Sequence, residues 1–187
     1  RNPGPLSRAR LVIAAAPGVE LSIGFPPISA PTARVLVLGS LPGRKSLEMR
    51  QYYAQPQNVF WRIMDSLFGA GPALAYADRI ERLVASRIAV WDVLAAGERS
   101  GSLDSAIVAA SIVVNDFGAF FERHGDVGLI CFNGAKAGEL YRRHVRPALA
   151  PRFAALEQRL LPSTSPANAS LSFATKLARW SAALTGR

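Results

Sequence analysis

Four apolar runs of the sequence each end in a side chain that can bind a polar ligand. These side chains are Ser40, Asp92, Asn133 and Ser163. Hydroxyl and amide groups hold ligands by hydrogen bonds, and a carboxylate such as Asp92 can activate a water molecule. If the four runs are neighbouring strands, these groups meet, and the sequence then predicts a ligand site where they do.

The order of strands and helices along the chain would bring the four polar ends together. Apolar, β-rich runs predict strands over 34–38, 88–91, 127–132 and 156–161, and helices are predicted over 59–68, 76–86, 116–123, 135–145 and 172–184, with a loop over 95–104. This alternation predicts parallel βαβ units, hence an α/β three-layer sandwich with a central four-stranded parallel sheet flanked by helices. The carboxyl ends of such strands share one sheet edge, where α/β folds bind ligands.

The length of 187 residues fits one domain with a substantial core. We expect this domain to span residues 25–187 and residues 1–24 to form a flexible N-terminal extension, either processed or foreign to the natural chain. The apolar stretch over 11–17 ends at Pro17, well short of the ~20 residues of a membrane span. We therefore expect neither a targeting role nor a membrane span for this stretch, and the resemblance described below implies no membrane partner.

Charge and cysteine content narrow the class of protein. The chain carries 22 basic and 13 acidic residues, a net charge of +9, which predicts a polyanionic partner because cations on phosphates release condensed counterions. Composition alone leaves DNA, RNA and a membrane surface open, and an ordinary arginine-rich surface is the alternative. The single cysteine, Cys131, excludes an internal disulfide and a cysteine-ligated iron–sulfur cluster, and the expected location is the reducing cytoplasm.

Six motifs follow one another in a recognisable order. They are Gly-Ser-Leu-Pro-Gly at 39–43, Tyr-Tyr-Ala-Gln-Pro-Gln-Asn-Val-Phe-Trp at 52–61, Trp-Asp-Val-Leu at 91–94, Gly-Ser-Leu-Asp at 101–104, Phe-Asn-Gly at 132–134 and Leu-Pro-Ser-Thr-Ser-Pro-Ala-Asn-Ala at 161–169. From about residue 24 to residue 184 the chain resembles the uracil-DNA glycosylase superfamily. It is most similar to the hypoxanthine-DNA (deoxyinosine) glycosylase branch. The resemblance implies the superfamily's fold and an enzyme of base excision repair.

The implied activity is that of a monofunctional DNA glycosylase, which flips out a deaminated base and hydrolyses its N-glycosidic bond. Uracil and hypoxanthine share a lactam edge, so both stay open as substrates. The expected partner is DNA containing a deaminated base, and the expected oligomeric state is a monomer. We expect no metal or organic cofactor. A zinc site in particular is disfavoured, because His124 and His144 lie apart from acidic residues that could complete it. Lys45 has no evident partner that would activate it for a lyase reaction. The alternative is a catalytically silent nucleic-acid- or nucleotide-binding module of the same fold.

The resemblance also implies where the catalytic groups lie. Superfamily members frequently carry Asn or Asp in the third place of the first turn, and here that place is Leu41, which cannot accept a proton. In the deoxyinosine branch the polar function falls on Asn58, which would orient water and stabilise charge through its carbonyl. Asn58 could instead cap the following helix. Asp92 is the second catalytic candidate, and its alternative role is to orient the loop over 97–104.

The remaining implied residues bind the base and the DNA backbone. Tyr53 would stack on the flipped base or else pack in the core, and Asn133 would read the base edge or else form a plain turn. Gln55 and Gln57 stand where relatives commonly present His and Arg, which leaves substrate preference open. The base-binding set is Gly39, Ser40, Leu41, Pro42, Gly43, Tyr53, Phe132 and Asn133, and the backbone and wedge set is Ser46, Ser163, Thr164, Ser165, Ala167 and Asn168.

Overall fold

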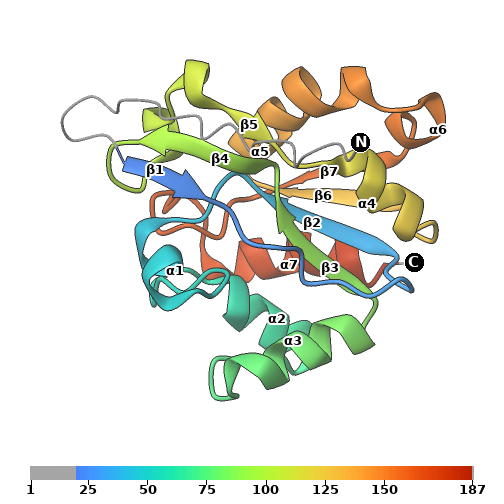
Figure 1. Ribbon diagram of the computed structural model, residues 1–187. Coiled ribbons are helices and arrows are strands. Elements are labelled where there is room, and N and C mark those ends of the chain that lie inside the picture. Colours follow the sequence, from blue (N-terminus) through green and yellow to red (C-terminus); the bar gives the residue numbers. More distant parts are fainter. Residues whose placement is uncertain (1–19, 187) are drawn as a thin grey trace, which may run out of the picture.

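A four-stranded parallel sheet forms the centre of the protein in the computed structural model, which describes residues 20–186 (Figure 1). The strands, in their order across the sheet, are β3 (Ile88–Asp92), β2 (Val35–Gly39), β6 (Leu129–Asn133) and β7 (Glu157–Leu161). Every residue of β2 and β3 is buried, as expected for strands that are covered on both faces. The predicted parallel sheet is confirmed, and its strands begin and end within two residues of their predicted positions.

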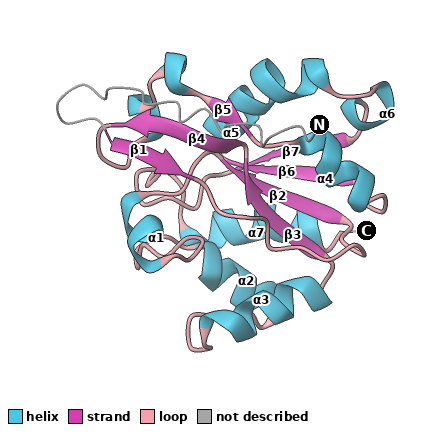
Figure 2. Ribbon diagram, in the orientation of Figure 1, coloured by secondary structure: helices cyan, strands magenta, loops and turns pink. Residues whose placement is uncertain are grey.

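Helices cover both faces of the sheet and complete the predicted three layers (Figure 1, Figure 2). One face carries α2 (Phe60–Phe68), α3 (Tyr76–Ala85) and α7 (Phe173–Leu184), and the other carries α4 (Phe117–Arg123), α5 (Ala135–Leu140) and α6 (Pro151–Ala154). Aromatic rings pack helix against helix on one face and helix against sheet on the other. The ring centroids of Phe60 and Trp180 are 6.0 Å apart on one face, and those of Trp91 and Phe120 are 5.2 Å apart on the other. The α/β sandwich is thus packed from both sides.

A second, antiparallel sheet lies next to the first and was not predicted. It contains β1 (Glu20–Ile23), β4 (Leu94–Arg99) and β5 (Val113–Val114), in the order β1-β4-β5. The predicted loop over 95–104 is therefore wrong as far as Arg99, because pairing with β1 supplies backbone partners that local turn residues do not reveal. Residues 20–24, expected to belong to an N-terminal extension over 1–24, are part of the fold, because they pair with β4. Residues 1–19 of that extension lie outside the described residues.

The predicted helix over 135–145 is divided. The α5 helix ends at Leu140, and the chain continues as a π-helical turn over Tyr141–Val145 and a 3-10 turn over Arg146–Ala148. Pro147 lies in the last of these turns and lacks the N–H group that would extend an α-helix.

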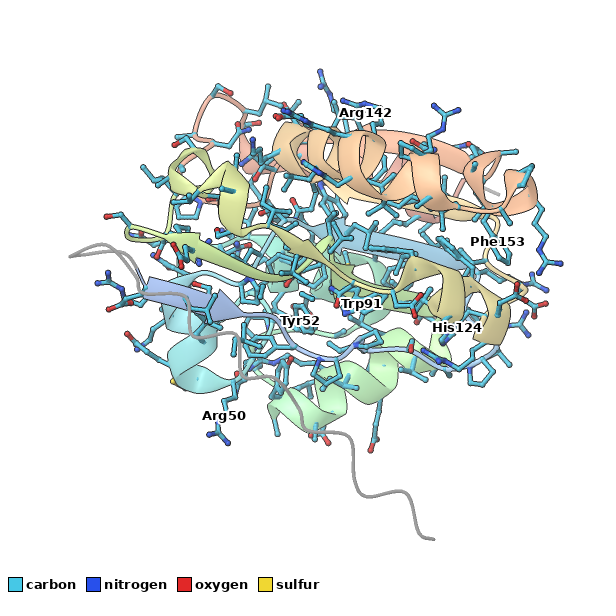
Figure 3. The ribbon with its side chains drawn as sticks, turned by 45° about the horizontal axis from the view of Figure 1, so that its top comes forward. Arg50, Tyr52, Trp91, His124, Arg142 and Phe153 are labelled. Carbon is cyan, nitrogen blue, oxygen red and sulfur yellow. The ribbon has the colours of Figure 1, made fainter. Side chains whose placement is uncertain are left out.

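The remaining elements are short. The α1 helix (Arg44–Met49) follows β2, and 3-10 turns over Asp104–Ala106 and Ala109–Ser111 link β4 to β5. Figure 3 shows Trp91 inside the molecule and Arg142 at its surface. Within residues 20–186, no helix is both long enough and apolar enough to cross a membrane.

Candidate active site

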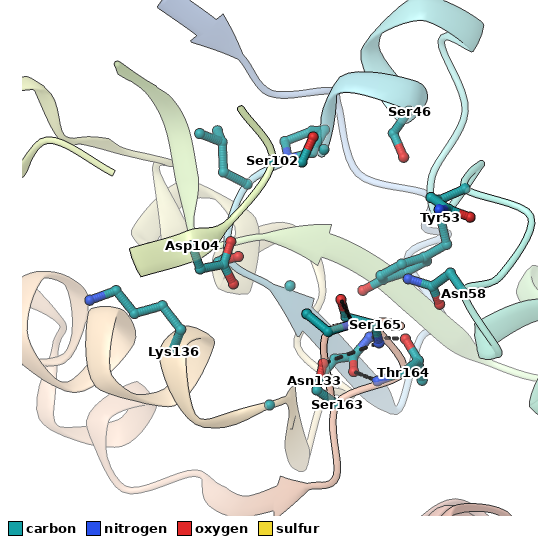
Figure 4. Close-up of a pocket in the computed structure, with 18 of the residues that line it drawn as sticks. Ser46, Tyr53, Asn58, Ser102, Asp104, Asn133, Lys136, Ser163, Thr164 and Ser165 are labelled. Carbon is teal, nitrogen blue, oxygen red and sulfur yellow. Dashed lines mark hydrogen bonds between the residues drawn. The ribbon is translucent and has the colours of Figure 1, made fainter. Parts of the chain in front are cut away.

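A pocket of about 470 Å³ opens at the carboxyl ends of the four parallel strands (Figure 4). The four side chains predicted to meet, one from the end of each strand, all line it. The rest of the wall comes from the chain between β2 and α2, from residues 102–104 and 134–136, and from the loop that follows β7. The predicted site residues that line the pocket are Gly39, Ser40, Leu41, Pro42, Gly43, Ser46, Tyr53, Asn58, Asp92, Asn133, Ser163, Thr164, Ser165, Ala167 and Asn168.

Phe132 is the predicted base-binding residue that the structure places elsewhere. Its side chain is 1% exposed, does not line the pocket, and packs against Tyr141 with 5.2 Å between ring centroids. Successive side chains of a strand point to opposite faces, so Phe132 faces the α5 layer while its neighbour Asn133 reaches the pocket. Phe132 belongs to the core.

The first turn, residues 39–43, is held by the chain that follows β3. Val93 N donates to Gly39 O at 2.9 Å and Leu94 N donates to Ser40 O at 3.0 Å. The buried Arg99 guanidinium of β4 donates to Pro42 O. The unpredicted strand β4 therefore fixes the turn whose glycines and serine line the pocket.

Asp92 lies at the end of β3 with its side chain aimed at this turn. The residue is 3% exposed, a Cβ atom at position 39 would overlap its Oδ1, and its Oδ2 has no hydrogen-bond partner within the described residues. Burial raises the pKa of Asp92 to about 8, the charge of Asp104 adds to this, and Arg99 opposes it. At neutral pH this carboxyl is therefore mainly protonated, and it can donate a hydrogen bond more readily than it can activate water.

Tyr53 presents an aromatic ring to the same pocket. Its ring stacks on Phe60, with 4.0 Å between centroids and 27° between planes, and its backbone adopts a left-handed φ of 54°. Hydrogen bonds fix the preceding residue: Tyr52 N donates to Tyr76 Oη at 2.9 Å, and Trp61 Nε1 donates to Tyr52 O at 2.8 Å. Tyr53 therefore packs against the core and lines the pocket at the same time.

The hydroxyl group of Tyr53 is a second buried polar atom that makes no hydrogen bond of standard geometry to a described residue, although the nearby Asn133 amide partly opposes the rise in its pKa. It would lie 3.1 Å from a Cβ atom at position 39, so it approaches the same stretch of backbone as the Asp92 carboxyl. Burial raises the pKa of Tyr53, and the hydroxyl stays protonated at any physiological pH. Two protonated groups therefore end at Gly39, where only glycine leaves room for them.

Asn58 lies at the start of α2 and also lines the pocket. Its Oδ1 accepts a hydrogen bond from Phe60 N at 3.0 Å, while Val59, not Asn58, occupies the N-cap position. The expected cap is thus displaced by one residue, and Val59 N donates to Thr164 O at 3.0 Å. The side-chain nitrogen of Asn58 makes no hydrogen bond to any described residue, and Figure 4 shows the side chain beside Tyr53. The carbonyl therefore supports the helix while the amide group remains available to a ligand.

Asn133 joins the ends of β6 and β7. Its Nδ2 donates to Thr164 Oγ1 and its Oδ1 accepts from Thr164 N, both at 2.9 Å (Figure 4). The next residue, Gly134, has a φ of 96°, and a Cβ atom there would lie 2.9 Å from Ser163 Cβ. Since two of the amide's bonding positions are used within the protein, Asn133 can offer a base one N–H and one lone pair.

Helix α7 holds both ends of the loop over 162–168. Trp180 Nε1 donates to Pro162 O at 3.0 Å, and Lys176 Nζ donates to Asn168 O at 2.6 Å. Lys176 is 5% exposed, which is unusual for a lysine. Both residues fix the loop from outside its own sequence, and no local pattern identified them.

The segment over 102–104 is a further part of the site that was missed. Asp104 lines the pocket and pairs with Arg99, its Oδ1 lying 3.9 Å from an Arg99 guanidinium nitrogen. Burial raises the pKa of Asp104, while Ser40, Arg99 and Lys136 oppose the rise. The sequence feature that could have identified this segment as part of the site is the motif Gly-Ser-Leu-Asp, which contributed to the resemblance.

Other candidate groups are occupied by structural contacts. Lys45 Nζ lies 3.3 Å from Glu48 Oε2 at the pocket edge. His124 stacks on Phe120, with 4.0 Å between ring centroids, and its Nε2 lies 3.1 Å from Ser29 Oγ. Among residues 20–186, no three His, Cys, Asp or Glu side chains are grouped to hold a metal ion.

Comparison with known proteins identifies the family to which this α/β sandwich and its pocket belong. The family model of the uracil DNA glycosylase superfamily matches residues 26–184, and the chain belongs to that superfamily. Over 146 residues it is 41% identical to the hypoxanthine DNA glycosylase of Methanosarcina acetivorans and 38% identical to that of Methanosarcina barkeri, covering 78% of this chain and 87% of each relative. The resemblance found in the motifs is confirmed, and so is the enzyme class, DNA glycosylase.

A solved structure agrees with the fold. The solution NMR structure of a Methanosarcina acetivorans protein, proposed to be a uracil DNA glycosylase, is 36% identical in sequence, with a TM-score of 0.74. The similarity covers 89% of this chain and 98% of that one. The two proteins therefore share their fold over most of both chains.

Proposed function

We propose that this enzyme is a monofunctional DNA glycosylase that excises a deaminated base, hypoxanthine or uracil, flipped out of DNA. The observation that carries the proposal is the meeting of an aromatic ring, an amide and a protonated carboxyl in one pocket: Tyr53, Asn58 and Asp92. The names of the two Methanosarcina relatives favour hypoxanthine as the first lesion to test. The proposal includes a monomer that works in the cytoplasm, in base excision repair, without a metal or organic cofactor.

The proposed reaction adds water to C1′ of the deoxyribose and breaks the bond from C1′ to the base nitrogen. The base leaves with the electron pair of that bond and takes up a proton, and an abasic site remains. Tyr53 would support the flipped base by stacking. Asn58 would orient the water and stabilise the positive charge on the sugar, while protonated Asp92 would donate a hydrogen bond to the base as negative charge grows on it.

Monofunctional chemistry is favoured by the surroundings of Lys45. A lyase needs a neutral amine that forms a Schiff base, and a lysine reaches that state by burial or beside another cation. Lys45 is half exposed and its Nζ lies 3.3 Å from Glu48 Oε2, so it is neither buried nor without a carboxylate partner. Borohydride should therefore trap no covalent adduct with lesion DNA, and an adduct that disappears in Lys45→Ala would contradict this part of the proposal.

A lesion panel tests the proposed activity. Duplexes with a single hypoxanthine, uracil or xanthine would be incubated with the enzyme and cleaved by alkali at abasic sites. We expect strand scission with hypoxanthine, uracil or both. Salt-sensitive binding with no scission for any lesion would instead favour the silent nucleic-acid-binding module.

A further inference from the structure

One exposed apolar side chain lies at the edge of the pocket. Leu103 is 57% exposed, and among the exposed large hydrophobic residues of the described chain it alone lines the pocket. Removing an apolar side chain from water is favourable, so bases that covered Leu103 would gain binding energy. What distinguishes Leu103 from the other exposed apolar residues is its place on the pocket edge.

The protein holds Leu103 between two fixed neighbours. Ser102 Oγ accepts a hydrogen bond from Arg44 N at 3.2 Å, and Asp104 pairs with the buried Arg99. Arg99 in turn donates to Pro42 O of the first turn. The segment is thus tied to the pocket wall on both sides of Leu103, so the side chain stands at a defined place on the edge.

The opposite edge of the pocket offers shorter side chains for the same task, of which Pro166 is the largest apolar one. Figure 4 shows Ser102 and Asp104 across the pocket from Ser163, Thr164 and Ser165. Ala167 and Asn168 follow in that second loop. A base that leaves the stack leaves a gap the size of its ring, which an apolar wedge can fill more completely than the methyl group of an alanine can.

We propose that Leu103 inserts into the base stack of duplex DNA beside the flipped nucleotide, from the edge opposite the loop over 162–168. This inference rests on the proposed glycosylase function. Cations on both sides suit such an approach, because Arg44, Lys45 and Lys136 also line the pocket and can contact the flanking phosphates. Leu103 would act by stabilising the opened duplex and would take no part in bond cleavage.

The test compares Leu103→Ala with Leu160→Ala, since Leu160 is 58% exposed and does not line the pocket. Single-turnover excision of hypoxanthine would be measured in a duplex and in the same strand alone. We expect Leu103→Ala to slow excision from the duplex by about tenfold or more, the effect of losing a buried leucine side chain. Excision from the single strand, which needs no opening, should stay within about twofold of wild type.

Two further measurements isolate the wedge. Leu103→Met should recover most of the duplex rate, because methionine also provides a long apolar side chain. The fluorescence of 2-aminopurine next to the lesion should rise when wild-type enzyme binds the duplex and should rise less with Leu103→Ala.

The outcomes separate this inference from the proposed function. Wild-type enzyme that excises no lesion from either substrate would overturn the proposed function. If the wild type is active, equal duplex rates for Leu103→Ala and Leu160→Ala would overturn the wedge. An equal fall in the excision rate of Leu103→Ala on single-stranded and duplex DNA would also overturn the wedge, since Leu103 would then act as part of the pocket wall.

Discussion

The interior and the edge of the pocket differ in how their side chains are held. The interior group, Tyr53, Asn58, Asp92 and Asn133, is positioned by strand ends, ring stacking and hydrogen bonds within the protein. The edge group, Lys45, Leu103, Lys136 and residues 165–168, is largely exposed, and two of its members are cations. Rigidly held groups can position the bond that breaks, and exposed cations can bind the DNA phosphates. Substitutions in the interior should therefore change the excision rate, and substitutions at the edge should change DNA binding.

The interior also contains unmet hydrogen-bonding capacity. Tyr53 Oη and Asp92 Oδ2 are buried and make no hydrogen bond of standard geometry to a described residue. A polar base could form hydrogen bonds with both groups, and an apolar molecule of the same size could not. The edge has no comparable selectivity, because exposed cations bind phosphates of any sequence.

The sharpest test of the interior is Asn58→Ala. We expect its single-turnover excision rate to fall by about a hundredfold or more, or about 2.7 kcal/mol, with little change in DNA affinity. Asn58→Ser separates catalysis from helix support, because serine keeps an acceptor for Phe60 N but lacks the amide. Asn58→Ser should therefore be as slow as Asn58→Ala but more stable to denaturant, by up to about 1 kcal/mol.

Gln57→Ala is the matched control, since Gln57 is a neighbouring amide that does not line the pocket. It should retain wild-type activity. If Asn58→Ser were active, Asn58 would serve the helix alone. If Asn58→Ala remained active while Asp92→Ala did not, the two catalytic assignments would be exchanged.

The second test uses the titration of Asp92. If its protonated form assists departure of the base, excision should slow by about tenfold for each pH unit above a pKa of about 8. Asp92→Asn keeps a donor and removes the titration, so its rate should stay flat over that range. A wild-type rate that rises through pH 8 would mean that the carboxylate activates water instead.

Stability should follow the same group. The pKa of Asp92 rises from 3.8 to about 8 on folding, so the folded state favours the neutral form. Its contribution is complete below pH 3.8 and is lost as the pH increases through 8. Urea unfolding should show that Asp92→Asn gains stability over wild type as the pH rises from 5 to 9. A constant difference would contradict the burial of this carboxyl.

A third test addresses the link between two interior strands. Asn133→Ala removes both hydrogen bonds to Thr164 and leaves Thr164 N buried without a partner, so unfolding should require about 1–3 kcal/mol less. Thr164→Val removes only the bond to the hydroxyl and should cost less. Equal costs for the two variants in denaturant titrations would show that the backbone bond contributes nothing.

The interior was largely predictable from the sequence. Strands at regular spacing each end in a polar residue, and parallel topology forces those ends to one edge, so Asp92, Asn133 and Ser163 could be placed together. Asn58 and Tyr53 were identified through the resemblance and do line the pocket. Their catalytic and stacking roles stay predictions.

The supports of the pocket could not be predicted in the same way. β1 and β4 pair across a long separation in sequence, and Gly97 and Gly101 made β4 resemble a loop. The buried Arg99 and Lys176 hold pocket loops through contacts that exist only once the chain is folded. Charged side chains are expected to be exposed, and only the folded structure shows that these two are buried.

The smallest expected effect belongs to the edge. Lys136 is partly exposed, lines the pocket and bonds to Glu139 at 3.1 Å, and Arg152 is an exposed cation that pairs with Glu122 away from the pocket. If Lys136 contacts a phosphate, Lys136→Ala should weaken DNA binding several-fold at low salt and reduce the slope of log affinity against log salt by about 0.9. Arg152→Ala should leave that slope unchanged. Because the edge would act on binding, excision by Lys136→Ala at saturating enzyme should equal wild type; a slower rate would place Lys136 among the interior groups.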